Sequence, residues 1–262
     1  MQYQDIKLEH HGKVMWLTLN RPASLNALSD RMLDEMAHTL DRLDSDTRVL
    51  VFAAEGRAFC AGADLGMADN QPDAESVAAA TDAFLEKASA LFMRIEALPL
   101  PTIATVNGIA LAGGLELILC CDLVIAAESA VLGDGHARYG LLPGAGGSFR
   151  LPRKVGENRA KYLMYTADLL PAATLEQWGL VNEVVADDRL YETTAALADK
   201  VAKKSPLGLA RMKRLVDDAP GQSPAVAQRA ELLMSWAHNR SQDRPEGLAA
   251  FREKREPVFI GS

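Results

Sequence analysis

Short apolar runs alternate with amphipathic stretches along the first two thirds of the chain. Four runs have the continuous apolar character of buried strands, namely residues 14–19, 48–53, 102–106 and 123–126. Between them, residues 30–43 repeat apolar side chains at helical spacing behind a possible cap at Asp30, and residues 73–98 are alanine-rich and helical. Strands that alternate with helices favour parallel pairing. The pattern predicts an α/β fold with a parallel sheet, and no repeat of fixed period is visible.

The last third of the chain has a different pattern. After Val185 nothing predicts a further strand, and the expected helices cover residues 189–204, a segment that begins at 206, and residues 225–239 and 245–255. Ser205-Pro206 and Ser223-Pro224 each place a capping residue before a proline, which is typical of a helix start.

The change of pattern predicts two parts: an α/β core over residues 1–200 and a helical C-terminal region over residues 201–262. The helical region is small, and its helices carry apolar faces. We therefore expect those faces to pack on neighbouring subunits.

Composition excludes several classes of protein. No apolar run approaches the roughly 20 residues that span a bilayer, and the polar N-terminal segment lacks the apolar region of a signal peptide. We therefore expect a cytoplasmic protein with no membrane partner. The net charge of −7 argues against a nucleic-acid partner, although it does not oppose a small ligand that carries phosphates.

The three cysteines, Cys60, Cys120 and Cys121, match neither a disulfide framework nor a zinc site. We interpret them as buried thiols in a reducing compartment. No metal site is expected.

Two glycine-containing segments could bring the backbone close to a ligand. Residues 56–65 (GRAFCAGADL) follow an expected strand, and their small side chains allow main-chain N–H groups to face a negative charge. A plain tight loop is the alternative. In residues 106–117 a strand ends and a helix opens at Gly113-Gly114, where unpaired N–H groups favour an anion.

Glu116 lies one turn into that helix, inside the apolar run LAGGLELILCC. A carboxylate is costly to bury without a partner or a function. Either it interacts only with the helix dipole, or it belongs to a site.

A third segment, residues 132–147, is too rich in glycine for ordinary packing and contains Asp134, His136, Arg138 and Tyr139. It has neither the Gly-Lys-Ser/Thr ending of a phosphate loop nor a GxGxxG start. GxSxG is also absent from the chain, so a hydrolase elbow is unsupported.

Together the motifs resemble the crotonase (enoyl-CoA hydratase/isomerase) superfamily over nearly the whole chain. Six segments occur in family order: NRPASLNAL at 20–28, GRAFCAGADL at 56–65, VNGIALAGGLEL at 106–117, CDLVIAAESA at 121–130, GLLPGAGGSFRLPRKVG at 140–156 and EGLAAFREKREPVF at 246–259. The resemblance implies a crotonase-like spiral of ββα units with a helical C-terminal trimerisation region. It also implies a homotrimer or a dimer of trimers.

The resemblance further implies an acyl-CoA substrate and no separate cofactor, because coenzyme A is part of the substrate. By position, the N–H groups of Ala63 and Gly113 would form an oxyanion hole for the thioester oxygen. The coenzyme A chain would contact Ala23, Ser24, Leu25, Ala61, Asp64 and Leu65. Phe251 and Lys254 would reach its adenine end from a neighbouring subunit.

The chain departs from the family in the catalytic pair. Hydratases of this family use two glutamates, of which the first matches Glu116 and the second matches His136. We therefore expect an enoyl-CoA hydratase-like lyase in which Glu116 is the base and His136 supplies the acid or shares the water.

Alternatives remain open at this point. An isomerase or a cyclic β-ketoacyl-CoA hydrolase needs the same oxyanion hole and one strong base. A non-catalytic member could bind acyl-CoA or RNA, since a relative of this family binds RNA. The basic residues at 203–204 and 211–214 are diluted by neighbouring acids, which favours a solvated helix face.

Two further expectations concern the surroundings of the site. His10 and His11 are expected in a polar turn and, like His38 and His238 in helices, as surface or packing residues. Residues 66–80 are expected to form a mobile wall of the pocket, and residues 67–84 to select the acyl chain.

Overall fold

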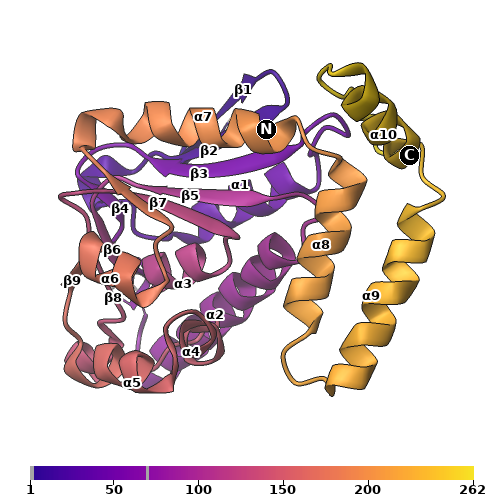
Figure 1. Cartoon of the computed structure of the whole chain (residues 1–262). Coiled ribbons are helices and arrows are strands. Elements are labelled where there is room, and N and C mark those ends of the chain that lie inside the picture. The colour runs from indigo at the N-terminus through magenta and orange to yellow at the C-terminus, as the bar shows by residue number, and fades with distance from the viewer. Residues whose placement is uncertain (1–2, 69–70) are drawn as a thin grey trace.

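The computed structural model describes residues 3–68 and 71–262 and contains a six-stranded sheet at its centre (Figure 1). The strand order is β1 (Ile6–His11), β2 (Val14–Leu19), β3 (Val49–Ala54), β5 (Thr102–Val106), β7 (Leu123–Ala127) and β10 (Glu183–Val185). All neighbours pair in parallel except β1, which pairs antiparallel at one edge. The four predicted apolar runs are β2, β3, β5 and β7, so the prediction of a parallel α/β core is confirmed.

A second sheet consists of four short strands. Its order is β4 (Ala58–Cys60), β6 (Ile109–Leu111), β8 (Val131–Gly133) and β9 (Leu170–Pro171). None was predicted, because two or three residues are too few to show an alternation of apolar and polar positions.

The two sheets are connected by a repeated ββα unit. In each unit one strand joins the large sheet, the next joins the small sheet, and a helix follows: β3–β4–α2, β5–β6–α3 and β7–β8–α4. The first strands begin at residues 49, 102 and 123, so the units have unequal lengths. This explains why the sequence shows no period.

The helices occupy defined places around the sheets. Their bounds are α1 (Asp30–Leu40), α2 (Ala74–Glu96), α3 (Gly113–Leu119), α4 (Gly147–Val155), α5 (Glu157–Thr166), α6 (Ala172–Trp178), α7 (Leu190–Ala202), α8 (Pro206–Asp218), α9 (Pro224–His238) and α10 (Asp243–Glu253). Helix α7 crosses one face of the large sheet, and α2 and α3 lie on the opposite side (Figure 1). In the described part of the chain, no helix is long and apolar enough to cross a membrane.

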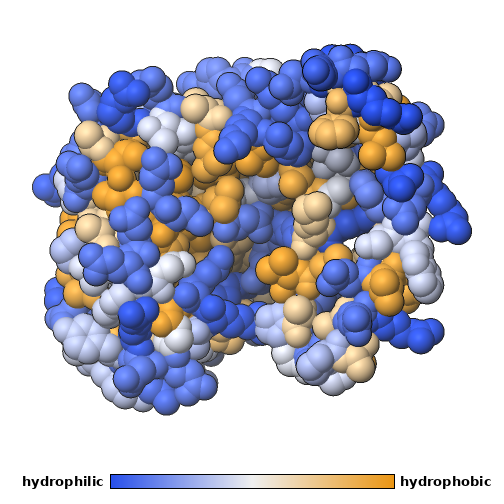
Figure 2. Space-filling model, viewed as in Figure 1, coloured by the Kyte–Doolittle hydropathy of each residue, from blue (hydrophilic) through white to orange (hydrophobic). Residues whose placement is uncertain are grey.

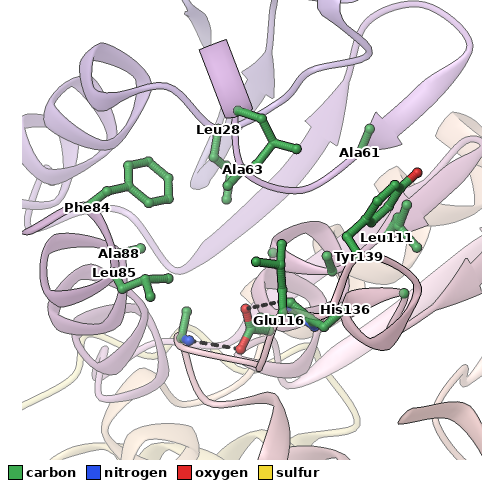
Figure 3. Close-up of a pocket in the computed structure, with 16 residues that line it drawn as sticks. Leu28, Ala61, Ala63, Phe84, Leu85, Ala88, Leu111, Glu116, His136 and Tyr139 are labelled. Carbon is green, nitrogen blue, oxygen red and sulfur yellow. Dashed lines mark hydrogen bonds and ion pairs between the residues drawn. The ribbon is translucent and has the colours of Figure 1, made fainter. Parts of the chain in front are cut away.

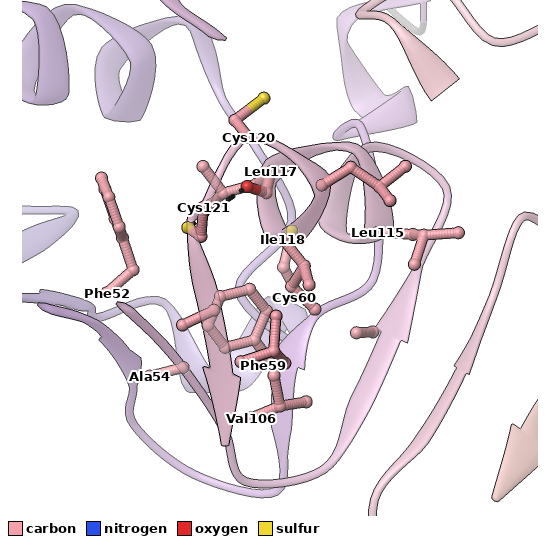
Figure 4. Packing of buried hydrophobic residues seen from close by; sticks show 14 of the residues in the cluster. Phe52, Ala54, Phe59, Cys60, Val106, Leu115, Leu117, Ile118, Cys120 and Cys121 are labelled. Atoms are coloured by element: carbon pink, nitrogen blue, oxygen red, sulfur yellow. Dashed lines mark hydrogen bonds between the residues drawn. The ribbon is translucent and has the colours of Figure 1, made fainter. Parts of the chain in front are cut away.

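The core between the sheets and α3 is apolar and contains the cysteines. Phe52, Phe59 and Ile118 pack here beside Cys60, with Cys120 and Cys121 at the end of α3 (Figure 4). All three thiols are buried, as predicted. Burial raises the pKa of Cys60 and of Cys121 to about 12, so both stay protonated and unreactive at neutral pH.

The C-terminal helices lie to one side of the body, where α8 and α9 pack against each other (Figure 1). Helix α9 has no fully buried residue, and its Leu232, Leu233 and Trp236 are each about half exposed. Figure 2 shows apolar surface over this part of the molecule. The domain boundary at residue 200 and the trimerisation role stay predictions; helix α7 itself runs to Ala202.

The predicted start of α1 was wrong by one residue. Ser29, not Asp30, caps α1: its Oγ accepts a hydrogen bond from Met32 N–H at 3.0 Å, and the helix ends at Leu40. The predicted helix starts at Ser205 and Ser223 are confirmed: Ser205 caps α8 through Gly208 N–H, and Ser223 is the N-cap residue of α9, although its side chain makes no cap hydrogen bond.

One further expectation needs correction. His10 and His11 belong to strand β1 and not to a turn. Within the expected wall at residues 66–80, the chain is helical from Ala74 onward, because the Asp73 carboxylate accepts a hydrogen bond from Ser76 N–H and starts α2; the mobility of this wall stays a prediction. Residues 69 and 70 lie outside the described residues.

Candidate active site

The two predicted backbone donors come from loops that pack directly on each other. Gly62 has φ +99°, and a Cβ added to it would lie 3.1 Å from the Cβ of Ala112. A Cβ added to Gly113 would lie 3.6 Å from the backbone nitrogen of Ala63. Ala112 itself has φ +50° and ψ −117°, a rarely populated conformation that is typical of functional sites. The loops therefore bring the N–H groups of Ala63 and Gly113 close together.

Pairing with Leu28 orients the Ala63 amide. Leu28 N–H donates to Gly62 O at 2.8 Å, and Leu28 O accepts from Asp64 N–H at 2.9 Å. Because successive backbone N–H groups of an extended strand point to opposite sides, the Ala63 N–H points away from Leu28. Among the described residues, neither this N–H nor that of Gly113 has a hydrogen-bond acceptor.

Helix α3 can approach the small sheet only through a glycine. A Cβ on Gly114 would lie 2.2 Å from Cys60 O, which no larger residue tolerates. All seven residues of α3 are buried as a result. This close contact positions Glu116, which lies one turn into the helix, in the lining of a pocket.

The Glu116 carboxylate is held by a separate loop. Its Oε1 accepts hydrogen bonds from Ala145 N–H and Gly147 N–H, both at 2.9 Å. Its side chain is buried and lies beside His136 in the pocket (Figure 3). Burial raises the pKa of Glu116, while the two N–H groups and His136 partly oppose that rise. A residue that interacted only with its own helix dipole would not be bonded in this way.

His136 faces Glu116 from a 3₁₀ turn, His136–Tyr139. Its Nε2 lies 3.9 Å from Glu116 Oε2, and its Nδ1 lies 3.1 Å from Asp134 Oδ1. Burial disfavours the charged ring, but Asp134 and Glu116 outweigh burial and raise the pKa of His136. The structure thus brings together the two side chains predicted as the catalytic pair.

The remaining pocket wall is apolar and surrounds these polar groups (Figure 3). It is formed by Leu28, Phe84, Leu85, Ala88, Leu111 and Leu141. Sequence reasoning missed most of this wall and the Ala145 and Gly147 amides. The glycine run before α4 was the available signal for those amides.

The residues expected along coenzyme A lie beside the same pocket. Ala61 N–H donates to Leu25 O at 3.0 Å, which joins the turn containing Ala23 and Ser24 to the loop containing Asp64. Ala61 and Leu65 line the pocket, and Leu65 is exposed.

Asp64 is held in place by a cation. Arg21 donates to it at 2.7 Å, and this bond lowers the pKa of the Asp64 carboxyl. A charged carboxylate therefore stands at the edge of the predicted coenzyme A path.

Phe251 and Lys254 are not near the pocket of their own chain. They belong to the end of α10, across the molecule from α3 (Figure 1), and Phe251 is 84% exposed. Their predicted contact with coenzyme A would require a second subunit and stays a prediction.

The basic cluster at 211–214 is largely paired within the protein. Lys213 contacts Asp122 at 2.9 Å, and Arg214 contacts Asp218 at 2.7 Å. Arg211 is hydrogen-bonded to His238 Nδ1 at 3.0 Å. Such pairing leaves little free positive charge for a polyanion.

The chain is similar to known proteins over nearly its whole length. A family model described as enoyl-CoA hydratase/isomerase matches residues 9–262. The mouse (Mus musculus) enoyl-CoA hydratase domain-containing protein 2, mitochondrial, is 41% identical over 94% of this chain and 83% of its own length. The 2,3-dehydroadipyl-CoA hydratase of Escherichia coli is 37% identical over 98% and 99%. The crystal structure of an enoyl-CoA hydratase from Bacillus anthracis superimposes with a TM-score of 0.93 at 36% identity, covering 99% of this chain and all of that one.

Proposed function

Because this chain belongs to the enoyl-CoA hydratase/isomerase family, we propose that it adds water to the double bond of a 2-enoyl-CoA thioester. One observation carries the proposal. Glu116 and His136 face each other in an apolar pocket whose wall also contains the unpaired N–H groups of Ala63 and Gly113.

The two N–H groups would bind the thioester oxygen. This oxygen gains negative charge when a nucleophile attacks the β-carbon, and donors that are already oriented lower the energy of that state. Removal of one such donor costs about 3–4 kcal/mol in other enzymes.

Glu116 and His136 would exchange the protons. Glu116 takes a proton from water as the water oxygen bonds to the β-carbon and the π bond opens. Charged His136 donates its Nε2 proton to the α-carbon, which completes the addition of H and OH. Glu116 is then protonated and His136 neutral. Proton transfer between Oε2 and Nε2, 3.9 Å apart, restores the starting state.

The acyl group would lie against the apolar wall of α2. Phe84, Leu85 and Ala88 are presented there on one helical face. This lining favours an unsubstituted hydrocarbon chain over a charged one. Relatives are named for crotonyl-CoA and for 2,3-dehydroadipyl-CoA.

A double-bond isomerase is the second candidate. It is favoured by the presence of one carboxylate, Glu116, where hydratases of this family carry two. Isomerisation needs one base that removes a proton and returns it elsewhere, and it uses the same oxyanion hole.

The test is incubation of the purified full chain with 2-enoyl-CoA esters of 4 to 12 carbons. Loss of the conjugated-thioester absorbance together with a mass gain of one water supports hydration. An unchanged mass with a new double-bond position would replace hydration by isomerisation, and no reaction on any ester would reject both. The cytoplasmic location and the trimer or dimer of trimers stay predictions, to be checked by fractionation and ultracentrifugation.

A further inference from the structure

We infer that Asp134 is a positioning residue that orients the His136 ring toward Glu116 and keeps that ring cationic; the inference rests on the proposed function of this site. Asp134 has no role in the proton transfers above. The residue is nevertheless buried, with 1% of its surface exposed, and its Oδ1 lies 3.1 Å from His136 Nδ1.

Two glycines determine where Asp134 lies. A Cβ on Gly133 would lie 2.2 Å from Asp168 O, so the backbone at the end of β8 is packed against another segment. Gly135 has φ +70°, and a Cβ there would lie 2.3 Å from Leu111 Cδ1. The backbone contact leaves no room for a side chain at Gly133, and the left-handed φ at Gly135 favours glycine. The tight turn between them directs the Asp134 carboxylate back toward His136, whose N–H donates to Asp134 Oδ1 at 3.3 Å.

The Asp134 carboxylate and the His136 ring are the partners available to each other. Within the described chain, Asp134 Oδ2 and His136 Nδ1 are buried and make no hydrogen bond of good geometry. The short approach is to the other carboxylate oxygen: His136 Nδ1 lies 3.1 Å from Asp134 Oδ1, which is close enough for an ion pair although it is not a hydrogen bond of good geometry. A buried carboxylate without a compensating charge is costly, and His136 is the cation in contact with it.

This contact has two consequences for His136. A proton on Nδ1 that faces Asp134 fixes the orientation of the ring and leaves Nε2 facing Glu116. Carboxylates on both sides of the ring also favour the imidazolium, the form that can donate to the α-carbon. A neutral imidazole with its proton on Nδ1 could only accept a proton at Nε2 and would compete with Glu116 for the same task.

Among the described residues, two carboxylates face the His136 ring: Asp134 at Nδ1 and Glu116 at Nε2. In the same turn Arg138 donates to Ala167 O, and Tyr139 is exposed. The charged and titratable side chains of α5, which packs on the turn, are all exposed: Glu157, Arg159, Lys161, Tyr162 and Tyr165. The charged groups that determine the protonation state of His136 are therefore Asp134 and Glu116.

The experiment compares wild type, Asp134→Asn, Asp134→Glu and a control, Asp122→Asn. Asp122 is a partly buried carboxylate outside the pocket that accepts hydrogen bonds from Thr102 and Lys213. His136 is titrated in each full-length protein by ¹⁵N-edited NMR of the imidazole, with its signal assigned through His136→Gln. The kcat and KM of each protein are measured across pH on the best 2-enoyl-CoA ester.

We expect Asp134→Asn to lower kcat about 10- to 100-fold, as removal of a ring-orienting partner does elsewhere, with KM nearly unchanged. The midpoint of the His136 titration and the alkaline limb of kcat should both move to lower pH. Asp134→Glu should restore part of the lost kcat and should move the His136 midpoint part of the way back toward the wild-type value. Asp122→Asn should lower the free energy of unfolding without moving either.

If the His136 midpoint and the alkaline limb are the same in Asp134→Asn as in wild type, the inference is wrong, whatever happens to kcat. If wild type hydrates no ester, the proposed function fails, while the NMR titration still decides the role of Asp134. If Asp134→Asn does not fold, Asp134→Glu and the wild-type midpoint decide instead: a wild-type midpoint at or below the ordinary histidine value overturns the inference.

Discussion

Helices α3 and α9 differ in where their side chains find partners. Every residue of α3 is buried, and its first turn fits against β4 because Gly114 lacks a side chain. Helix α9 has no fully buried residue and exposes Leu232, Leu233 and Trp236. The geometry around α3 is therefore complete within one chain. The apolar face of α9 is what a contact between subunits would cover.

This difference predicts that changes at α3 alter chemistry and that changes at α9 alter assembly.

The largest effect is expected from Glu116→Gln. The amide still accepts from Ala145 N–H and Gly147 N–H, so the fold should persist, but it cannot take a proton from water. A general base contributes about 10²–10⁴-fold, and kcat should fall by that amount. Steady-state kinetics on the best enoyl-CoA ester and a thermal melt measure the two quantities. Activity within threefold of wild type would remove Glu116 from the proposed mechanism.

The next effect is expected from Gly113→Pro. Gly113 is the first residue of α3, a position where proline is tolerated, and proline removes the N–H proposed for the oxyanion hole. Loss of one such donor should lower kcat roughly 10²–10³-fold. Gly113→Ala, which keeps the N–H beside Leu28 Cδ1, is the matched control. Equal losses in both variants would indicate steric damage, and the oxyanion role would lose its support.

A smaller effect is expected in the pH dependence of stability. The pKa of His136 is raised in the folded state, so the folded protein binds this proton more tightly than the unfolded chain does. The resulting stabilisation is complete below the unfolded value of about 6.5 and is lost as pH rises through the higher folded value. Urea unfolding of wild type and His136→Gln should therefore show a stability difference that shrinks as pH rises. A difference that stays constant from pH 6 to 9 would contradict the raised pKa.

The smallest effect on stability is expected at α9. Leu233→Ser with Trp236→Ser replaces side chains that are about half exposed in the single chain, so unfolding of an isolated chain should change by about 0.5 kcal/mol per site or less. Sedimentation should nevertheless show smaller assemblies than wild type, if these side chains lie between subunits. Exposed Tyr165→Ser on α5 is the control. Unchanged sedimentation of the α9 variant would exclude this face from the interface.

The sequence predicted the central strands and the C-terminal helices because each is long enough to show its period. It missed β4, β6, β8 and β9, whose two or three residues carry no periodic signal. The ββα repeat, which the family resemblance implied, gives no fixed period because equivalent strands begin at unequal intervals, at residues 49, 102 and 123.

Residue types and order by themselves determined the family resemblance, the parallel core and the pairing of Glu116 with His136 as candidates. Only the tertiary structure decided that Gly62 and Ala112 touch, that Ala145 and Gly147 hold the Glu116 carboxylate, and that Asp134 lies against His136. Such contacts join loops that are tens of residues apart. Their distances depend on how closely the backbones pack, which local patterns of apolar and polar residues do not encode.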